Sequence, residues 1–203
     1  MKELLPVDPT ATADLAPPRI SEIVLKTSRF EVMRDWYQLV LSATRVFEYD
    51  VPGRKAHGED RAVNFHRLCF LRIFWQFPYT EVLALFEVPE LRRVEQGTGL
   101  HHMQFRLASL DALADRHERL SRFGIEPYKS YNHGPSTSLY YEDPDANLVE
   151  LSGPNFETEE DYKEFFSSAG FAKNPAGVPI DLAAFMAALR AGADRRELVR
   201  LPS

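Results

Sequence analysis

The feature that most constrains this chain is one order of elements that occurs along it twice. Residues 20–27 alternate apolar and polar side chains as a strand does, and residues 28–42 carry apolar side chains at helical spacing. Three apolar segments follow, around residues 45–51, 64–75 and 81–89. This part of the chain therefore predicts a strand, a helix and three further strands, a βαβββ unit.

The same order returns after the polar stretch at residues 90–99. A strand and a helix come first and three strands follow, at residues 100–107, 109–123, 126–131, 136–143 and 147–153. Gly124 directly follows the predicted helix, as a helix-ending glycine does. When the two units are aligned, Glu22 takes the position equivalent to His102, and Glu87 takes the position equivalent to Glu150.

The repeat predicts an α+β fold in which two βαβββ units, at about 19–90 and 99–153, form a cleft-shaped mixed sheet. Together they make one domain over residues 19–153. Residues 1–18 contain four prolines and predict an extended N-terminal arm. Residues 154–203 predict a helical extension whose helices cover the sheet or a dimer surface.

Composition excludes several classes of partner. The 203-residue chain has a formal net charge of −6, with 24 basic and 30 acidic side chains spread along it, so we expect no nucleic acid partner. No apolar stretch reaches membrane-spanning length and the start does not resemble a signal peptide, so we expect a cytoplasmic protein that does not enter a membrane. The single cysteine, Cys69, lies in an apolar run and predicts a buried, inert thiol.

Candidate site residues gather in the second unit. Strand alternation sends the adjacent His101 and His102 to opposite faces, so only one of them can enter a cleft. The DPDAN sequence at residues 143–147 is a strong turn signal that brings Tyr140 and Glu150 onto neighbouring antiparallel strands. A glutamate in the middle of an apolar strand is costly to bury unless something compensates it, and a cation is the simplest compensator.

These residues carry a resemblance to a known family. The segments GLHHMQF and NHGPSTSLYYEDPDANLVEL and the later NF and NPAGV resemble the vicinal-oxygen-chelate superfamily, and within it the type I extradiol ring-cleavage dioxygenases, over about residues 19–180. Ala146 departs from the pattern where glycine is usual, and Tyr131 departs two residues before the histidine.

The resemblance implies roles for four residues. His102 and Glu150 match metal ligands, Tyr140 matches a hydrogen-bond partner of a substrate oxygen, and His133 matches an acid/base group near bound oxygen. It also implies Fe(II), with Mn(II) or Mg(II) as alternatives, and a small aromatic substrate cleaved with O2. Two histidines and one carboxylate around Fe(II) leave open positions for a catecholate and O2.

The chain departs from the family in its first unit. Glu22 stands where the family has its first histidine ligand, so the predicted metal ligands are Glu22, His102 and Glu150. Thr80 and Glu81 stand about where the family has a histidine pair that includes the substrate base, which makes Glu81 a candidate catalytic residue.

Two other functions stay open at this stage. The first is a metal-dependent isomerase or lyase of the glyoxalase type, in which Glu22, Glu81 or Glu87 moves a proton; there Glu87 would serve as a further ligand opposite Glu150. The second is a non-catalytic binding protein on the same scaffold. We expect a homo-oligomer in each case.

Overall fold

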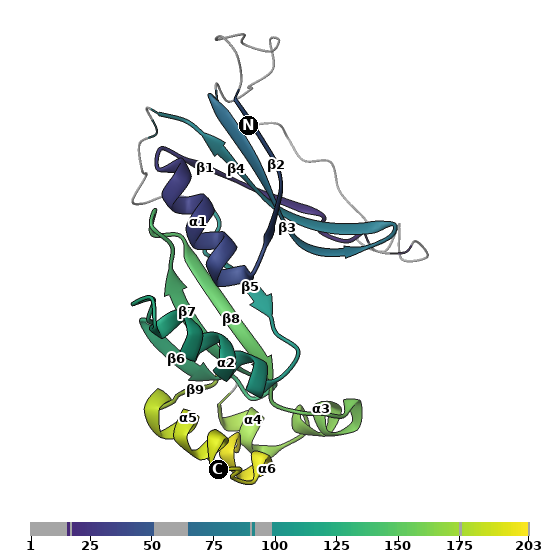
Figure 1. The fold of residues 1–203 in the computed structure, drawn as a ribbon. Coiled ribbons are helices and arrows are strands. Elements are labelled where there is room, and N and C mark those ends of the chain that lie inside the picture. Colours follow the sequence, from purple (N-terminus) through teal and green to yellow (C-terminus); the bar gives the residue numbers. More distant parts are fainter. Residues whose placement is uncertain are drawn as a thin grey trace.

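The computed structural model describes residues 16, 18–50, 65–89, 91, 99–174 and 176–202. The first unit lies at the top of Figure 1, the second unit in the middle and the C-terminal helices at the bottom. The predicted arm at residues 1–18 falls almost wholly outside the described residues. None of the helices in the described part of the chain combines the length and the apolar character needed to cross a bilayer.

The first unit is a four-stranded sheet covered on one face by a helix. Its strands are ordered β1-β4-β3-β2, with β1 parallel to β4 and the other pairs antiparallel. The elements are β1 (Glu22–Thr27), α1 (Phe30–Leu41), β2 (Thr44–Asp50), β3 (Arg67–Gln76) and β4 (Tyr79–Glu87). Helix α1 buries Phe30, Met33, Tyr37 and Val40 in the same core as the fully buried Cys69. Burial raises the pKa of the Cys69 thiol to about 11, so the thiol stays protonated at neutral pH.

The second unit repeats this plan with a fifth strand. Its sheet is ordered β5-β8-β7-β6-β9, with β5 parallel to β8. The elements are β5 (His102–Arg106), α2 (Leu110–Ser121), β6 (Lys129–Asn132), β7 (Ser136–Glu142), β8 (Leu148–Pro154) and β9 (Val178–Pro179). Ser109 caps α2 by accepting from the Ala112 amide, and Gly124 follows the helix with a φ of +72°.

The predicted α+β class and the two βαβββ units are confirmed, and each unit forms its own mixed sheet. The register corrects one detail of the alignment. Glu22 pairs with Val82 and His102 pairs with Leu148, so Glu150 corresponds to Ala84 and not to Glu87. Similar short strings, LFEV and LVEL, suggested the wrong match because they lie at different distances along their strands.

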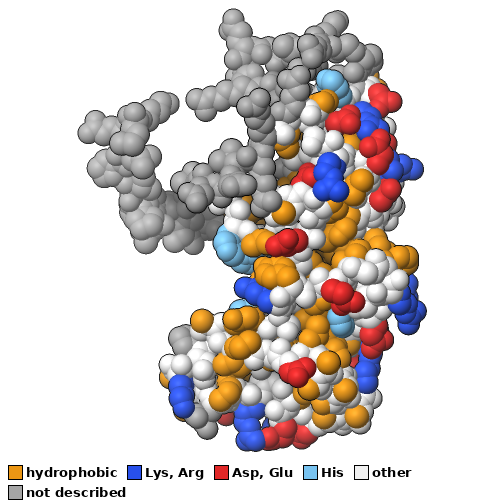
Figure 2. Space-filling view, turned by 90° about the vertical axis from the view of Figure 1, so that its left-hand side faces the viewer, with side chains coloured by type: hydrophobic (Ala, Val, Ile, Leu, Met, Phe, Trp, Pro, Cys, Tyr) orange, Lys and Arg blue, Asp and Glu red, His pale blue; other side chains and the backbone are white. Residues whose placement is uncertain are grey.

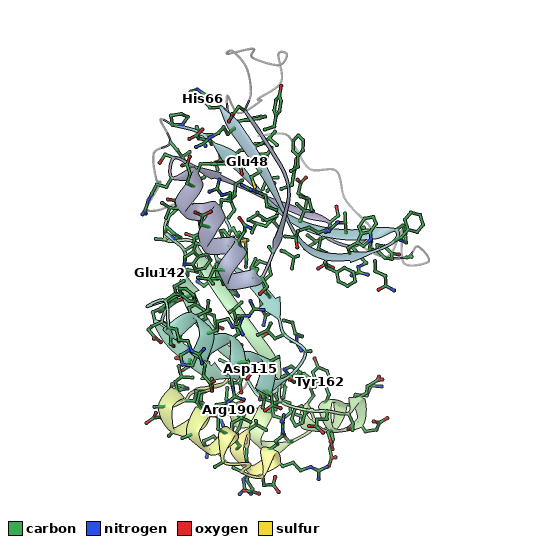
Figure 3. All side chains as sticks on the ribbon, in the orientation of Figure 1. Glu48, His66, Asp115, Glu142, Tyr162 and Arg190 are labelled. Carbon is green, nitrogen blue, oxygen red and sulfur yellow. The ribbon has the colours of Figure 1, made fainter. Side chains whose placement is uncertain are left out.

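The C-terminal extension is helical, as the sequence predicts. Its helices are α3 (Glu159–Phe165), α4 (Ala169–Lys173), α5 (Leu182–Arg190) and α6 (Arg195–Leu198). The helical segment expected after Pro154 divides in two, because Ser168 caps a new helix by accepting from the Phe171 amide. On the face shown in Figure 2, positive and negative side chains lie interspersed among hydrophobic ones. Figure 3 labels Asp115 on α2 and Arg190 on α5, which form an ion pair of 2.5 Å.

A buried hydrogen bond ties the two units together. The Tyr37 hydroxyl on α1 donates to Asp143, at the start of the DPDAN turn, over 2.7 Å. Burial, followed by the negative charge of Asp143, raises the pKa of Tyr37 above its ordinary value, so the hydroxyl keeps its proton. Arg116 on α2 adds a second link by donating to the Val40 carbonyl over 3.0 Å. The Tyr37–Asp143 bond anchors the turn that aligns β7 with β8.

Replacing Tyr37 by phenylalanine tests this link. Tyr37→Phe removes a buried hydrogen bond to a carboxylate, so we expect the free energy of unfolding to fall by about 1.5–3 kcal/mol. Tyr162→Phe is the control, because this side chain is 39% exposed and its loss of a hydroxyl should change stability by less than about 0.5 kcal/mol. Urea unfolding followed by circular dichroism measures both, and equal stabilities of the two variants would contradict the link.

Candidate functional site

Polar side chains line the face of the second sheet that α2 leaves uncovered. The register places four of them in one row across neighbouring strands: Gln104 on β5, Glu150 on β8, Tyr140 on β7 and Lys129 on β6. Strand alternation sends their sequence neighbours, such as Met103 and Val149, into the core. The open face therefore presents a carboxylate, a phenol, an amide and an ammonium side by side.

Glu150 is the most deeply placed charged group of this row. It is 3% exposed although it lies in the middle of a strand. Its Oε1 accepts from Gln104 Nε2 over 3.0 Å, and its Oε2 lies 3.0 Å from His102 Nε2. A buried carboxylate requires such partners, since an uncompensated charge in the interior is strongly unfavourable. Glu150 thus offers one oxygen to the amide and the other to the imidazole.

The two adjacent histidines are not equivalent. His102 is partly exposed and points Nε2 at Glu150, while its Nδ1 lies 2.7 Å from Nδ1 of the exposed His101. His102 therefore reaches the carboxylate, and only one histidine of the pair does so, as strand alternation predicts. His101 contacts Nδ1 of His102, the ring nitrogen that faces away from Glu150. A histidine nitrogen and a carboxylate oxygen at this separation form two members of a typical transition-metal ligand set.

Tyr140 and His133 form a second pair beside Glu150. The Tyr140 hydroxyl lies 2.8 Å from His133 Nε2, and His133 Nδ1 lies 2.9 Å from the Ala176 carbonyl oxygen. Tyr140 is 7% exposed, and burial, followed by the negative charge of Glu150, raises its pKa above the ordinary value. Tyr140 therefore keeps its proton at neutral pH and can donate a hydrogen bond. The Lys129 ammonium lies 4.2 Å from the centre of the Tyr140 ring.

The predicted residues of the first unit lie elsewhere. Glu22 is exposed on the face of the first sheet that α1 leaves uncovered, together with Val24 and Lys26. Glu81 accepts from Arg19 over 2.8 Å in an exposed ion pair. Within the residues that the structure describes, no group of three or more His, Cys, Asp or Glu side chains converges as a metal site would require. The structure thus brings His102 to Glu150 and His133 to Tyr140, and does not bring Glu22 or Glu81 to them.

Glu87 occupies the opposite face of the first sheet. It pairs with the buried Thr27 in the register and accepts two hydrogen bonds from Arg67, of 2.9 and 3.0 Å. Arg67 in turn lies over the Phe30 ring of α1. Glu87 and Glu22 therefore cannot share a site on one face of this sheet, and the idea of Glu87 as a further ligand opposite Glu150 is wrong.

Sequence reasoning missed two parts of the site. Gln104 stands two residues after His102, so strand alternation already places it on the same face and could have identified it. The Ala176 carbonyl carries no sequence signal, because every residue has one. Ala146, which stands where the family has glycine, adopts a φ of +61° in the turn, so the backbone keeps the conformation that favours glycine.

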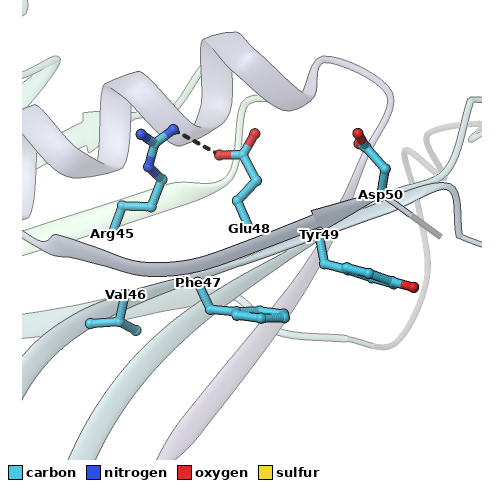
Figure 4. Close-up of a pocket in the computed structure, with 6 residues that line it drawn as sticks. All are labelled: Arg45, Val46, Phe47, Glu48, Tyr49 and Asp50. Carbon is cyan, nitrogen blue, oxygen red and sulfur yellow. Dashed lines mark hydrogen bonds and ion pairs between the residues drawn. The ribbon is translucent and has the colours of Figure 1, made fainter.

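Two concavities lie away from Glu150. One concavity of about 390 Å³ follows the edge strand β2. Its lining divides between the two faces of the strand, with Val46, Phe47 and Tyr49 on one side and Arg45, Glu48 and Asp50 on the other (Figure 4). A register shift between Arg45 and Phe47 puts Val46 and Phe47 on the same side. The other, of about 370 Å³, lies among the C-terminal helices and includes Phe165 and Arg196.

Comparisons with known proteins agree with this architecture. A sequence profile described as the Glyoxalase/Bleomycin resistance protein/Dioxygenase superfamily matches residues 19–151. Two proteins of Rhodococcus globerulus are similar over most of the chain. Biphenyl-2,3-diol 1,2-dioxygenase 2 is 37% identical, covering 87% of this chain and 84% of the relative, and biphenyl-2,3-diol 1,2-dioxygenase 3 is 32% identical, covering 89% and 87%.

The similarity to solved structures concerns the fold. A glyoxylase/bleomycin resistance protein/dioxygenase domain from Frankia sp. EAN1pec is 18% identical, with a TM-score of 0.51. The alignment covers 68% of this chain and 99% of that domain.

The prediction that Glu150 binds a metal is tested by removing one histidine at a time. His102→Ala deletes the nitrogen beside Glu150, so we expect metal affinity to fall by at least about 10-fold, measured by elemental analysis and by titration with Fe(II) under anaerobic conditions. His117→Ala is the control, since His117 lies on α2, outside this face, and should retain the metal. Equal metal content in the two variants would remove His102 from the site.

Proposed function

This chain belongs to the glyoxalase/bleomycin resistance protein/dioxygenase superfamily, and we propose that it is a metal-dependent extradiol dioxygenase that cleaves a catechol-like ring with O2. One observation carries the proposal above the others. The buried Glu150 carboxylate has His102 Nε2 on one side and the Tyr140–His133 pair on the other, in a chain similar to two biphenyl-2,3-diol 1,2-dioxygenases.

His102 and Glu150 offer two of the donors that a divalent metal needs. His102 Nε2 and Glu150 Oε2 lie only 3.0 Å apart, and one metal ion can bind both atoms. The Gln104 amide holds the other carboxylate oxygen and so orients Glu150. We assign Fe(II), with Mn(II) or Mg(II) as alternatives, to His102 and Glu150. Glu22, the third ligand that the sequence predicts, lies on the uncovered face of the first sheet. When bound, Fe(II) supplies open positions for the two substrate oxygens and O2.

Tyr140 and His133 handle the protons of the reaction. A catechol must lose a proton to bind as an anion, and the Tyr140 hydroxyl, directly across from Glu150 in the strand register, is a neutral group that can both donate and accept a proton. His133 Nε2, 2.8 Å behind it, can take the proton that Tyr140 passes on. The Lys129 ammonium adds a positive charge beside Tyr140 and favours an ionised substrate oxygen.

The first sheet supports a homodimer. Its uncovered face exposes apolar side chains, with Val24 43%, Phe47 49% and Tyr49 47% exposed. Exposed apolar side chains gathered on one face are typical of an interaction site, and we assign this face to a second copy of this chain. Sedimentation at micromolar concentration should give a dimer for the native protein and a monomer for Phe47→Asp, whereas a native monomer would contradict this assignment.

Oxygen uptake tests the activity. The Fe(II)-loaded protein should consume O2 with biphenyl-2,3-diol or a related catechol. Tyr140→Phe should keep the metal and lower kcat by roughly 10²–10⁴-fold, because it removes one acid/base group. Tyr128→Phe is the matched control, because Tyr128 lies directly before β6, and it should keep most of the activity.

Two results would overturn the proposal. Iron-loaded protein that consumes no O2 with any catechol, yet catalyses proton exchange or isomerisation, would indicate an isomerase or lyase of the glyoxalase type. Protein that binds catechols but turns none over would indicate a binding protein. A native rate in Tyr140→Phe would remove Tyr140 from the mechanism while leaving the activity in place.

A further inference from the structure

Both ring nitrogens of His133 have partners, and one of these partners decides where the proton sits. Nδ1 lies 2.9 Å from the Ala176 carbonyl oxygen. A carbonyl oxygen only accepts hydrogen bonds, so Nδ1 must carry the hydrogen. In the neutral ring Nε2 then has the lone pair, and it points at the Tyr140 hydroxyl, 2.8 Å away. The direction of this hydrogen bond therefore runs from Tyr140 to His133.

The carbonyl that holds Nδ1 belongs to a turn of the C-terminal extension. The Gly177 amide closes this turn by donating to the Asn174 carbonyl over 3.0 Å. Gly177 has a φ of +83°, and a Cβ there would lie 2.5 Å from the Asn132 carbonyl oxygen and 2.7 Å from His133 Cα. Only glycine lets the turn approach His133 this closely.

A buried amide network fixes His133 from the other side. Asn132 and Asn155 are 2% and 5% exposed. Asn132 Oδ1 accepts from the Gly134 amide over 2.8 Å and from Asn155 Nδ2 over 2.9 Å. Asn132 Nδ2 donates to the Val199 carbonyl over 2.7 Å, which ties the strand before His133 to the end of the chain. His133 thus lies between hydrogen-bonded backbone segments on each side.

We propose that the C-terminal extension is a positioning element for His133, in which the Ala176 carbonyl, brought close by Gly177, holds the ring in the Nδ1–H tautomer. The catalytic consequence rests on the proposed function. As the substrate hydroxyl gives its proton to Tyr140 Oη, the Tyr140 proton passes to His133 Nε2. The two transfers carry a net one proton from the substrate to His133, Tyr140 ends neutral, and the positively charged ring donates from Nδ1 to Ala176.

The Nε2–H tautomer would lose the hydrogen bonds described above at both ring nitrogens. A hydrogen on Nε2 would leave Nδ1 with a lone pair facing the lone pairs of the Ala176 carbonyl. It would also leave Nε2 unable to accept from Tyr140. Ala176 contributes only its backbone, so the extension sets the protonation state of His133 without placing a side chain in the site.

Imidazole ¹⁵N NMR measures the tautomer directly and needs no turnover. Histidine-labelled protein is studied at about pH 8, above the ordinary imidazole pKa of about 6.5, and the His133 signals are assigned by their loss in His133→Gln. We expect native His133 to be in the Nδ1–H form. A native Nε2–H form would overturn the proposal, whether or not the protein proves to be a dioxygenase.

Two glycine variants separate positioning from backbone strain. Gly177→Ala should shift His133 toward the Nε2–H form and lower kcat by about 10- to 100-fold with KM nearly unchanged. Gly192→Ala is the matched control, because Gly192 also has a positive φ, +75°, but has nothing within 4 Å of an added Cβ. It should lose some stability and keep the native tautomer and kcat.

The outcomes are distinct. Gly177→Ala with the native tautomer and the native kcat would contradict the proposal. If Gly177→Ala does not fold, the tautomer of His133 in the native protein still tests the proposal. Absence of O2 uptake in the native protein would overturn the proposed function, while the NMR result would still decide the positioning of His133.

Discussion

The burial of one carboxylate governs this structure. Glu150 lies in the middle of β8, is 3% exposed, and has apolar neighbours in sequence that belong to the core. A charge so placed must be compensated, and the open face is arranged around that requirement. Gln104 donates to one oxygen and His102 approaches the other. A divalent cation between His102 and Glu150 satisfies the same requirement, which links the stability of the sheet to the proposed chemistry.

The fold brings the site together through two pairings of different kinds. The parallel pairing of β5 with β8 places Gln104 next to Glu150, and the antiparallel hairpin of β7 and β8 places Tyr140 on its other side. The hairpin depends on its turn, where Asp143 accepts from the Asn147 amide within the turn and from Tyr37 of the first unit. The first unit therefore helps to hold the strand register on which the site depends.

The sequence predicted much of this from local rules. The DPDAN turn was enough to place Tyr140 and Glu150 on neighbouring strands, because this signal acts over a few residues. The place of His102 in the site came from the family resemblance, because its strand pairs with β8 over a long stretch of chain. The equivalence of Glu87 and Glu150 failed because it required the register of the first and last strands of each unit, which depends on packing far along the chain. The contact of His133 with Ala176 could not be predicted, since a backbone carbonyl 43 residues away has no sequence signature.

The central claim is that one metal ion lies between His102 and Glu150. Anomalous X-ray diffraction at the iron absorption edge, from crystals of Fe(II)-loaded protein grown without oxygen, tests it most directly. We expect one strong peak within about 2.0–2.2 Å of His102 Nε2 and of a Glu150 oxygen, distances typical of bound divalent metals. A peak that contacts neither His102 nor Glu150, or crystals that hold no iron at this face, would contradict it.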